Sequence, residues 1–254
     1  MKLLGKEFSK GKKVLNDPAF KDAQEKSRSE LNKRPTRTDI INYLLSKLNR
    51  QTTYLEIGVR NPNDNHAHIK ADKKYGVDPG VEFKDNPVSF QLTSDDFFTK
   101  LDKGEILDKG ILFDVVFIDG LHLAEQVDRD IINCLRYLKD DGFIVMHDCS
   151  PPTEWHAREN YAYKHSPAGV YWNGTTWKAF VKWRHENSVH SCCIDTDWGV
   201  GVIAKNYAIG NSITGPSTNP FYEFDVLDKD RKTYLNLMKF EDFKAIIDKA
   251  LPGN

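Results

Sequence analysis

Short, almost continuous apolar runs alternate along the chain with longer segments whose apolar residues recur every three or four positions. The clearest runs of the first kind are residues 53–58, 113–118 and 143–146. Such runs are typical of strands buried on both faces of a parallel sheet, whereas a segment such as 122–138 predicts an amphipathic helix. The alternation predicts an α/β fold of the Rossmann-like, doubly wound kind, with a mostly parallel sheet.

The same patterning predicts elements on either side of these runs. The predicted helices are at 36–48, capped by Thr36 or Thr38, from about residue 94, at 175–185 and at 241–251. The predicted strands are at 74–78 and 88–92, with an antiparallel pair at 189–194 and 200–204 that finishes the sheet. Residues 1–35 are expected to form a loose arm or short helices, and 205–235 to be irregular. We therefore divide the chain into an N-terminal arm and helix (1–50), a Rossmann-like domain (51–206) and a C-terminal extension (207–254).

The composition limits the kinds of molecule that the protein is expected to bind. The 254 residues carry a formal net charge of -1, so broad attraction to nucleic acid or to a membrane surface is not expected. The basic residues between Lys2 and Lys13 are interpreted as a solvated terminus. No apolar signal core or membrane-spanning run is found, and the four cysteines have no metal-type spacing, which favours reduced thiols and a cytoplasmic location. A small-molecule or carbohydrate substrate is expected, and the terminal segments are candidate surfaces for a homo-oligomer.

Acidic residues and histidines follow two of the predicted strands. Asp119 ends the run 113–118, His122 follows it, and His147 and Asp148 end the run 143–146. Ligands of open α/β sheets bind just beyond the carboxyl ends of the strands, so these side chains are expected to converge. Carboxylates and imidazoles together suit a divalent cation or a proton-transfer site. The structural alternatives are a helix-capping Asp119, a surface His122 and a hydrogen-bonded strand-end pair.

A second group of residues predicts an adenosine-type ligand without a pyrophosphate. Glu56 and Gly58 end the first strand, and Asp78 ends the second, about where an acid accepts the hydroxyls of a ribose. Asp95, at the start of a predicted helix, is placed to meet an adenine edge. The dinucleotide pattern G-x-G-x-x-G is absent after Gly58, and Pro62 removes one amide from that loop. Ordinary turn formation and helix capping are the competing explanations.

Residues 150–174 are expected to form a lid over the carboxyl edge of the sheet. The segment opens with two prolines and is rich in aromatic residues and histidines, which suit a sugar or a flat ring. The alternative is a wing of the hydrophobic core that closes over the edge of the sheet.

At these residues the chain resembles the class I S-adenosylmethionine (SAM)-dependent methyltransferases, over roughly residues 54–205. The segments 117–122 and 145–148 are similar to the metal-dependent branch that contains macrolide-sugar O-methyltransferases and cephalosporin-hydroxylase-type proteins. The resemblance implies a divalent metal, usually Mg2+, held by Asp119, His147 and Asp148, with His122 as the base. It also implies that Glu56, Gly58, Asp78, Asp95 and Asp119 bind SAM.

Two departures from the family pattern affect these expectations. Asn61 and Pro62 stand where a second glycine is common, and His147 replaces a carboxylate or amide, which admits Mn2+ or Fe2+ in place of Mg2+. The sequence thus predicts a metal-assisted O-methyltransferase acting on a hydroxyl of a sugar, glycoconjugate or related metabolite. A metal-dependent hydrolase or oxygenase, or a non-catalytic binding protein on the same fold, is the alternative.

Overall fold

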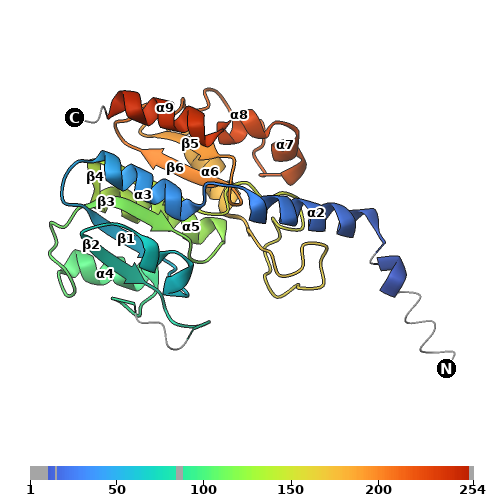
Figure 1. The fold of residues 1–254 in the computed structure, drawn as a ribbon, viewed down its shortest axis with the longest axis horizontal. Helices are drawn as coiled ribbons and strands as arrows, with labels where there is room; N and C mark the ends of the chain where they lie inside the picture. Colours follow the sequence, from blue (N-terminus) through green and yellow to red (C-terminus); the bar gives the residue numbers. More distant parts are fainter. Residues whose placement is uncertain (1–10, 15, 84–87, 252–254) are drawn as a thin grey trace.

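A seven-stranded sheet forms the centre of the molecule, for which the computed structural model describes residues 11–14, 16–83 and 88–251 (Figure 1). Its spatial order is β2-β1-β3-β4-β6-β5-β7. In chain order the strands are β1 (Thr53–Ile57), β2 (Lys73–Val77), β3 (Phe113–Ile118), β4 (Leu138–Met146), β5 (His190–Ile194), β6 (Val200–Ala204) and β7 (Leu237–Met238).

Strands β2, β1, β3 and β4 are parallel neighbours, and β6 is antiparallel to both β4 and β5. The short β7 adds a parallel pairing at the edge. All six residues of β3 are buried, as the continuous apolar run predicted for a strand covered on both faces. The predicted Rossmann-like α/β class, with a mostly parallel sheet and antiparallel strands near its end, is confirmed.

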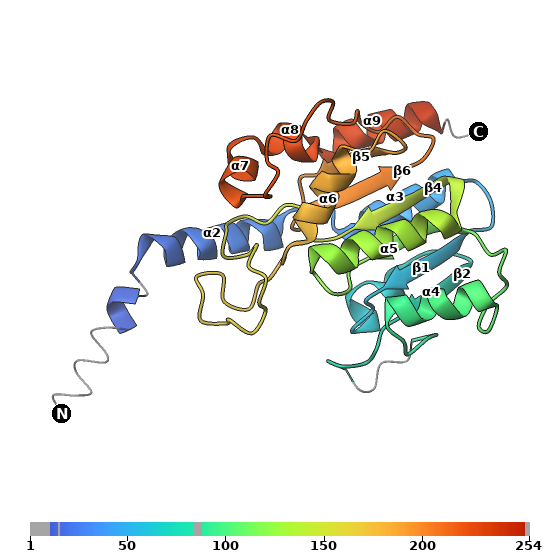
Figure 2. The ribbon, with the colours of Figure 1, turned by 180° about the vertical axis from the view of Figure 1, so that it is seen from behind.

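Helices cover both faces of this sheet. On one face lie α3 (Arg37–Lys47) and α9 (Phe240–Ala250), whose apolar residues form one buried cluster with alternate side chains of the strands (Figure 1). On the other lie α4 (Ser94–Lys103), α5 (Ala124–Tyr137) and α6 (Thr176–Arg184), which form a second cluster (Figure 2). Since α3 and α9 pack on the sheet, both terminal segments contribute to the core. The division at residues 50 and 206 stays a prediction.

Near the sheet, the structure differs from the prediction at two elements. Helix α5 begins at Ala124, so His122 lies in the preceding loop and not inside the helix as expected. The segment 88–92 is no regular strand, because only Phe90 forms an isolated bridge, to Val77. Among the described residues, two short 3-10 helices also follow β1, at Pro62–Asp64 and His66–His68.

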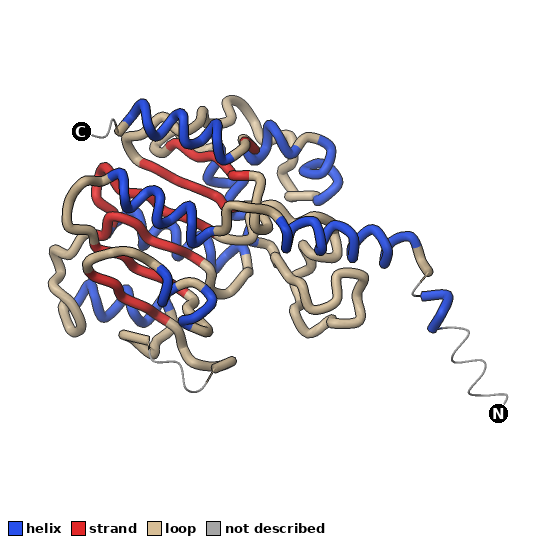
Figure 3. Tube along the Cα trace, viewed as in Figure 1, coloured by secondary structure: helices blue, strands red, loops and turns tan. Residues whose placement is uncertain are grey.

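The terminal regions are more ordered than expected. Helix α2 (Pro18–Asn32) runs for 15 residues where a loose arm or short helices were predicted, and the Asp17 side chain caps it by accepting from the Ala19 amide. It projects from the body beside the loop that follows β4 (Figures 1 and 3). The expected irregular region contains α7 (Phe224–Lys229) and α8 (Arg231–Leu235). Most of the basic cluster 2–13 lies outside the described residues.

One buried polar contact joins α2 to the predicted lid. The imidazole of His156, fully buried, bonds Ser27 Oγ of α2 through Nε2 at 2.9 Å and Thr153 Oγ1 through Nδ1 at 2.8 Å. Both partners are neutral hydroxyl groups, so neither would stabilise a positive charge on the imidazole. In the described part of the chain no helix is long and apolar enough to cross a membrane.

Protonation of His156 is expected to destabilise the fold. Burial lowers the pKa of His156 to about 4 from 6.5, so below pH 6.5 the unfolded chain binds the proton and the folded chain does not. The free energy of unfolding should therefore fall by roughly 2 kcal/mol between pH 7.5 and 4.5 on account of this group. Urea unfolding of the parent and of His156→Gln at both pH values measures it.

The comparison with the variant isolates His156 from other titrating groups. Burial raises the pKa of Asp130 to about 6, which stabilises the fold as the pH falls and so acts in the opposite direction. Asp130 is present in both proteins, so its effect cancels. Equal pH dependence in the parent and in His156→Gln would contradict the prediction.

Candidate active site at the carboxyl edge of the sheet

Backbone hydrogen bonds bring the ends of the parallel strands together. The Asp119 amide donates to Ile57 O at 2.9 Å, just beyond β3 and β1, and the His147 amide donates to Ile118 O at 3.1 Å, just beyond β4 and β3. The residues that follow these strands therefore meet at one edge. This is the edge of an open α/β sheet at which ligands bind.

Gly58 allows the first loop to pass very close to Asp119. Its φ is +86°, in the left-handed region that glycine enters without strain, and a Cβ there would lie 2.2 Å from Asp119 O. A side chain at this position would separate the loops after β1 and β3. The close approach at Gly58 thus brings the loop after β1 against the strand end that carries Asp119.

Two imidazoles each contact the same two carboxylates. His122 Nε2 lies 3.2 Å from Asp119 Oδ1, and His122 Nδ1 lies 3.3 Å from Asp148 Oδ2. His147 Nδ1 lies 3.4 Å from Asp119 Oδ1 and 3.1 Å from Asp148 Oδ2. The four residues singled out beyond the two strands are therefore brought together, and we call Asp119, His122, His147 and Asp148 the central cluster.

The loop after β4 fixes the orientation of His122. The main-chain oxygen of Trp172 lies 3.0 Å from His122 Nδ1, and because a carbonyl can only accept, Nδ1 carries a hydrogen. In the neutral ring the lone pair is then on Nε2. The Trp172 indole also stacks on the imidazole, with ring centroids 5.0 Å apart.

The end of the same loop is tied to the backbone of His122. The Thr175 amide donates to His122 O at 2.8 Å, and the neighbouring Gly174 has a φ of +61°. A Cβ on Gly174 would lie 2.1 Å from His122 O. The aromatic segment 150–174 therefore reaches the site, and its role as a lid stays a prediction.

Three further polar residues, which the sequence did not indicate, contact the central cluster. Arg37 Nη1, from the first turn of α3, lies 3.0 Å from His147 Nε2, and Asp197 Oδ1 lies 3.3 Å from the same nitrogen. Asn173 Nδ2 donates to Asp148 Oδ1 at 2.7 Å. Arg37 reads as an ordinary first residue of a helix and Asp197 as a turn residue, so no pattern marked either of them.

The charges of the cluster shift each other's pKa values. Burial opposes ionisation of Asp119, but the charge of His147 and a hydrogen bond from His122 outweigh it and hold the pKa of Asp119 well below its usual range. Burial likewise disfavours a charged His122, but Asp148 and Asp119 raise its pKa to about 9. Asp119 is thus ionised at neutral pH, and its cationic neighbours stabilise the charge.

Glu56 is held by one of its oxygens. Its Oε2 accepts from Tyr54 Oη at 2.7 Å and from Asn65 Nδ2 at 3.1 Å, and it lies 3.1 Å from His66 Nδ1. The side chain is 2% exposed. With these contacts confined to Oε2, Oε1 is the acceptor that a ligand's ammonium or hydroxyl group would use.

The other predicted cofactor residues lie farther along the same edge. Asp78 accepts from the amides of Arg60 and Gly80, both at 2.7 Å, through different oxygens. Asp95 lies in the first turn of α4 and contacts α5, accepting from Gln126 Nε2 at 3.2 Å. Asp78 is thus fixed in place beside the loop after Gly58, whereas the contacts of Asp95 are those of a residue that joins two helices.

The donor set fits a divalent cation. One ligand atom each from Asp119, His122 and Asp148 lies within 4.8 Å of the others, so this group contains the predicted base His122 in place of the predicted ligand His147. Two buried polar atoms next to this group also have no hydrogen-bond partner, namely Arg37 Nε and Asn173 Oδ1. Such orphaned atoms are costly unless water or a ligand satisfies them, so they favour a bound group at this cluster. Carboxylate oxygens suit Mg2+, and imidazole nitrogens also admit Mn2+ or Fe2+.

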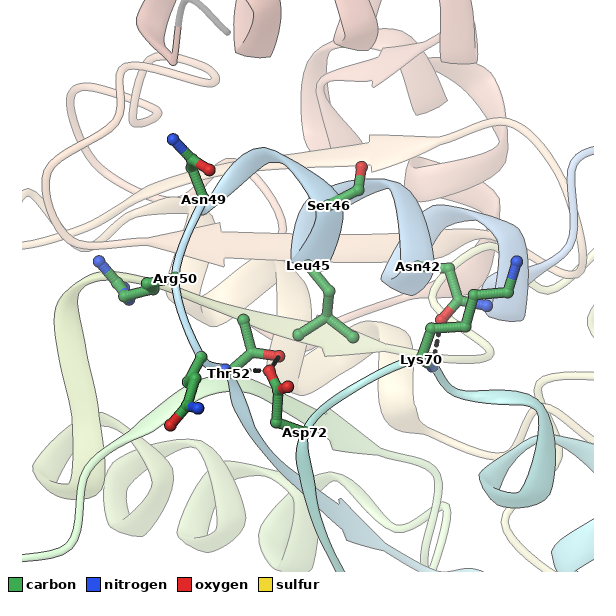
Figure 4. Close-up of a pocket in the computed structure, with 9 residues that line it drawn as sticks. Asn42, Leu45, Ser46, Asn49, Arg50, Thr52, Lys70 and Asp72 are labelled. Atoms are coloured by element: carbon green, nitrogen blue, oxygen red, sulfur yellow. Dashed lines mark hydrogen bonds between the residues drawn. The ribbon is translucent and has the colours of Figure 1, made fainter. Parts of the chain in front are cut away.

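A separate cavity of about 480 Å³ lies away from this edge (Figure 4). It sits where α3 leads into β1, at the amino end of that strand, and its lining includes Asn42, Thr52 and Asp72. Asp72 accepts from the Thr52 amide at 2.7 Å, and Asn42 Oδ1 accepts from the Lys70 amide at 2.7 Å. These side chains serve local structure and hold no group of the predicted site.

Comparison with known proteins gives one family match. Residues 37–149 match the family model described as a methyltransferase domain. The matched segment begins at Arg37 and ends just after Asp148, so it contains the whole central cluster and the expected cofactor residues. No curated protein matches the chain.

Solved structures with similar folds include several O-methyltransferases. An O-methyltransferase from Bacillus cereus in complex with SAH is 13% identical, with 74% of this chain and 90% of that chain covered and a TM-score of 0.41. TomG from Streptomyces achromogenes, an O-methyltransferase involved in tomaymycin synthesis, is 14% identical over 74% and 88%, with a TM-score of 0.40. MycE of the mycinamycin pathway, in complex with Mg, SAH and mycinamycin VI, is 15% identical over 79% and 57%, with a TM-score of 0.42.

Proposed function

We propose that this protein is a SAM-dependent, divalent-metal-assisted O-methyltransferase that acts on a hydroxyl of a sugar, glycoconjugate or related metabolite. One observation carries the proposal: inside the segment that matches the methyltransferase model, two carboxylates and two imidazoles converge beyond β3 and β4. A cation and a base on one edge are what an alcohol needs to become a nucleophile.

The cofactor side of the proposal rests on the ends of β1 and β2. Glu56 Oε1 would accept from the ammonium of the methionine part, since its other oxygen is already held by three side chains. Gly58 would let that part approach the backbone, and Asp78 would accept from the ribose hydroxyls. Asp95 remains the proposed contact to adenine, on the far side of the same edge.

The acceptor side rests on the central cluster and the lid. Asp119, His147 and Asp148 would hold the cation, and His122 Nε2 would take the proton of the acceptor hydroxyl. When bound, the cation would lower the pKa of that hydroxyl and the sulfonium would supply the methyl group. A cation beside Asp119 and Asp148 also opposes their effect on His122, whose pKa they raise to about 9, and so favours the neutral ring that a base requires.

Aromatic side chains of the lid support a sugar or a flat ring as the acceptor. Trp172 lies against His122, and the ring of Tyr161 lies 5.3 Å from that of Trp172. Aromatic faces pack against the apolar faces of such molecules and exclude water. The chain's own contribution to the rate would be positioning of the two reactants and exclusion of water.

Binding and turnover test the proposal separately. We expect calorimetry to detect binding of SAM and of S-adenosylhomocysteine, and methyl transfer from radiolabelled SAM to a panel of sugar hydroxyls in the presence of Mg2+. EDTA should abolish the transfer, and added Mg2+ or Mn2+ should restore it. Absence of binding of either cofactor would refute the proposal. Turnover without SAM that a chelator abolishes would indicate a hydrolase or oxygenase instead.

A further inference from the structure

We propose that Asp197 is a positioning residue that holds His147 in the orientation needed to bind the metal, and that Arg37 opposes the cation at the same site. The inference rests on the proposed function, because it concerns the metal. It assigns opposite effects on metal affinity to two residues that contact each other and that lie beside the central cluster.

The two nitrogens of His147 face different partners. Nδ1 is directed at Asp119 and Asp148, whereas Nε2 lies 3.3 Å from Asp197 Oδ1 and 3.0 Å from Arg37 Nη1. To bind a cation through Nδ1 a neutral ring must carry its hydrogen on Nε2. Because a guanidinium has no acceptor, the contact from Arg37 Nη1 to Nε2 favours the other tautomer, with the hydrogen on Nδ1 and directed at Asp148. Asp197 is the neighbouring group that can receive a hydrogen on Nε2 once a cation takes Nδ1. Carboxylates behind metal-binding histidines fix the tautomer and ring orientation in this way.

Asp197 is itself held in an unusual backbone conformation. It lies in the turn between β5 and β6, where Asp197, Trp198 and Gly199 have φ values of 45°, 65° and 86°. Non-glycine residues with positive φ are uncommon and persist where the surroundings impose them. Here the backbone amide of Arg37 donates to Asp197 Oδ2 at 2.8 Å, and Oδ1 lies 3.3 Å from His147 Nε2 and 3.2 Å from Arg37 Nη1.

Arg37 places a positive charge against the site. Its Nη1 lies 3.2 Å from Asp197 Oδ2, and its Nε lies 3.8 Å from Asp119 Oδ2 but has no hydrogen-bond partner. The guanidinium therefore attracts Asp119, a carboxylate that a cation would use. The shortest hydrogen bond to Asp197 comes from the main chain of Arg37, so a change of the Arg37 side chain removes only the longer contacts of Nη1, at 3.2 Å.

Measuring the metal affinity of variants shows whether Asp197 and Arg37 act on the metal or only form a structural ion pair. We expect Asp197→Asn to weaken Mn2+ binding, measured by electron paramagnetic resonance and calorimetry, by about 10–100-fold. We expect Arg37→Gln to strengthen it by about 10-fold, since a competing positive charge is removed. A pair that only tied α3 to the β5–β6 turn would give changes of the same sign, or none.

Two controls make the result specific. Asp195→Asn changes an acid two residues away in the same turn, whose side chain pairs with Lys33 and not with His147, and should leave Mn2+ affinity unchanged. In a His147→Ala background, Asp197→Asn should have no further effect. Thermal unfolding and SAM binding of each variant establish that it is folded.

The outcomes distinguish the inference from the proposed function. If the parent binds Mn2+ and Asp197→Asn binds it equally well, or if Asp195→Asn loses as much affinity, the role of Asp197 is refuted and the metal site stands. If Arg37→Gln weakens binding, the opposing role of Arg37 is refuted. If the parent binds SAM but no Mn2+, the metal part of the proposed function fails, and this inference with it.

Discussion

Asp119→Asn is expected to lower methyl transfer by about 1000-fold or more at saturating Mg2+. Both imidazoles of the central cluster contact Asp119, and its pKa is held well below the usual range, so it is ionised at the proposed cation site at neutral pH. The amide has nearly the same shape but no charge. Loss of a metal's charge stabilisation is worth several kcal/mol, or roughly three powers of ten in rate.

The measurement is the initial rate of transfer from radiolabelled SAM, together with Mn2+ affinity. Asp140→Asn is a matched control, since Asp140 has the same chemistry but a side chain that is 85% exposed on the opposite edge of the sheet, near Lys205. The control should retain full activity. A full rate for Asp119→Asn, in a protein that binds SAM, would show that the carboxylate takes no part in the reaction.

His122→Gln is expected to lower the rate of methyl transfer by about 100- to 10,000-fold, the range typical for loss of a general base. The lone pair of the neutral ring lies on Nε2, because the Trp172 carbonyl holds the hydrogen on Nδ1. Glutamine can keep a hydrogen bond to that carbonyl but cannot take a proton. The rate should fall while Mn2+ affinity is retained, since the proposed metal ligands are Asp119, His147 and Asp148.

His122 is close enough to both carboxylates to serve as a metal ligand instead, so the two readouts decide between roles. A parallel loss of Mn2+ affinity and rate in His122→Gln would make it a ligand and would contradict the assignment as base. Partial recovery of the rate of His122→Ala on addition of free imidazole, with Mn2+ affinity unchanged, would support the base.

The sequence could predict the part of the site that lies directly after the strands. The runs that became β3 and β4 are buried on both faces, which leaves a continuous apolar pattern, and parallel strands must end at one edge. The residues directly after them, Asp119 and His147 among them, therefore had to meet. The chemistry of the cluster followed from periodicity and from one topological rule.

Residues that reach the site from elsewhere left no comparable pattern. Arg37 lies in the first turn of α3 and Asp197 in a tight turn, where charged residues are ordinary. Their meeting at His147 depends on how α3 and the β5–β6 turn pack, which local sequence does not encode. Helix α2 was underestimated for a related reason: it buries only Ala23 and Ser27, so it shows little of the apolar periodicity that marks a helix.

The hydrogen bond from the Thr175 amide to His122 O couples the movement of the segment 150–174 to that of the proposed proton acceptor. Gly174, beside it, leaves no space for a side chain between them. Any opening that admits an acceptor must therefore either pivot before this residue or carry the imidazole along. In the second case the proton-accepting geometry would form only when the entrance is shut, and wasteful hydrolysis of a reactive sulfonium would be suppressed in the open state.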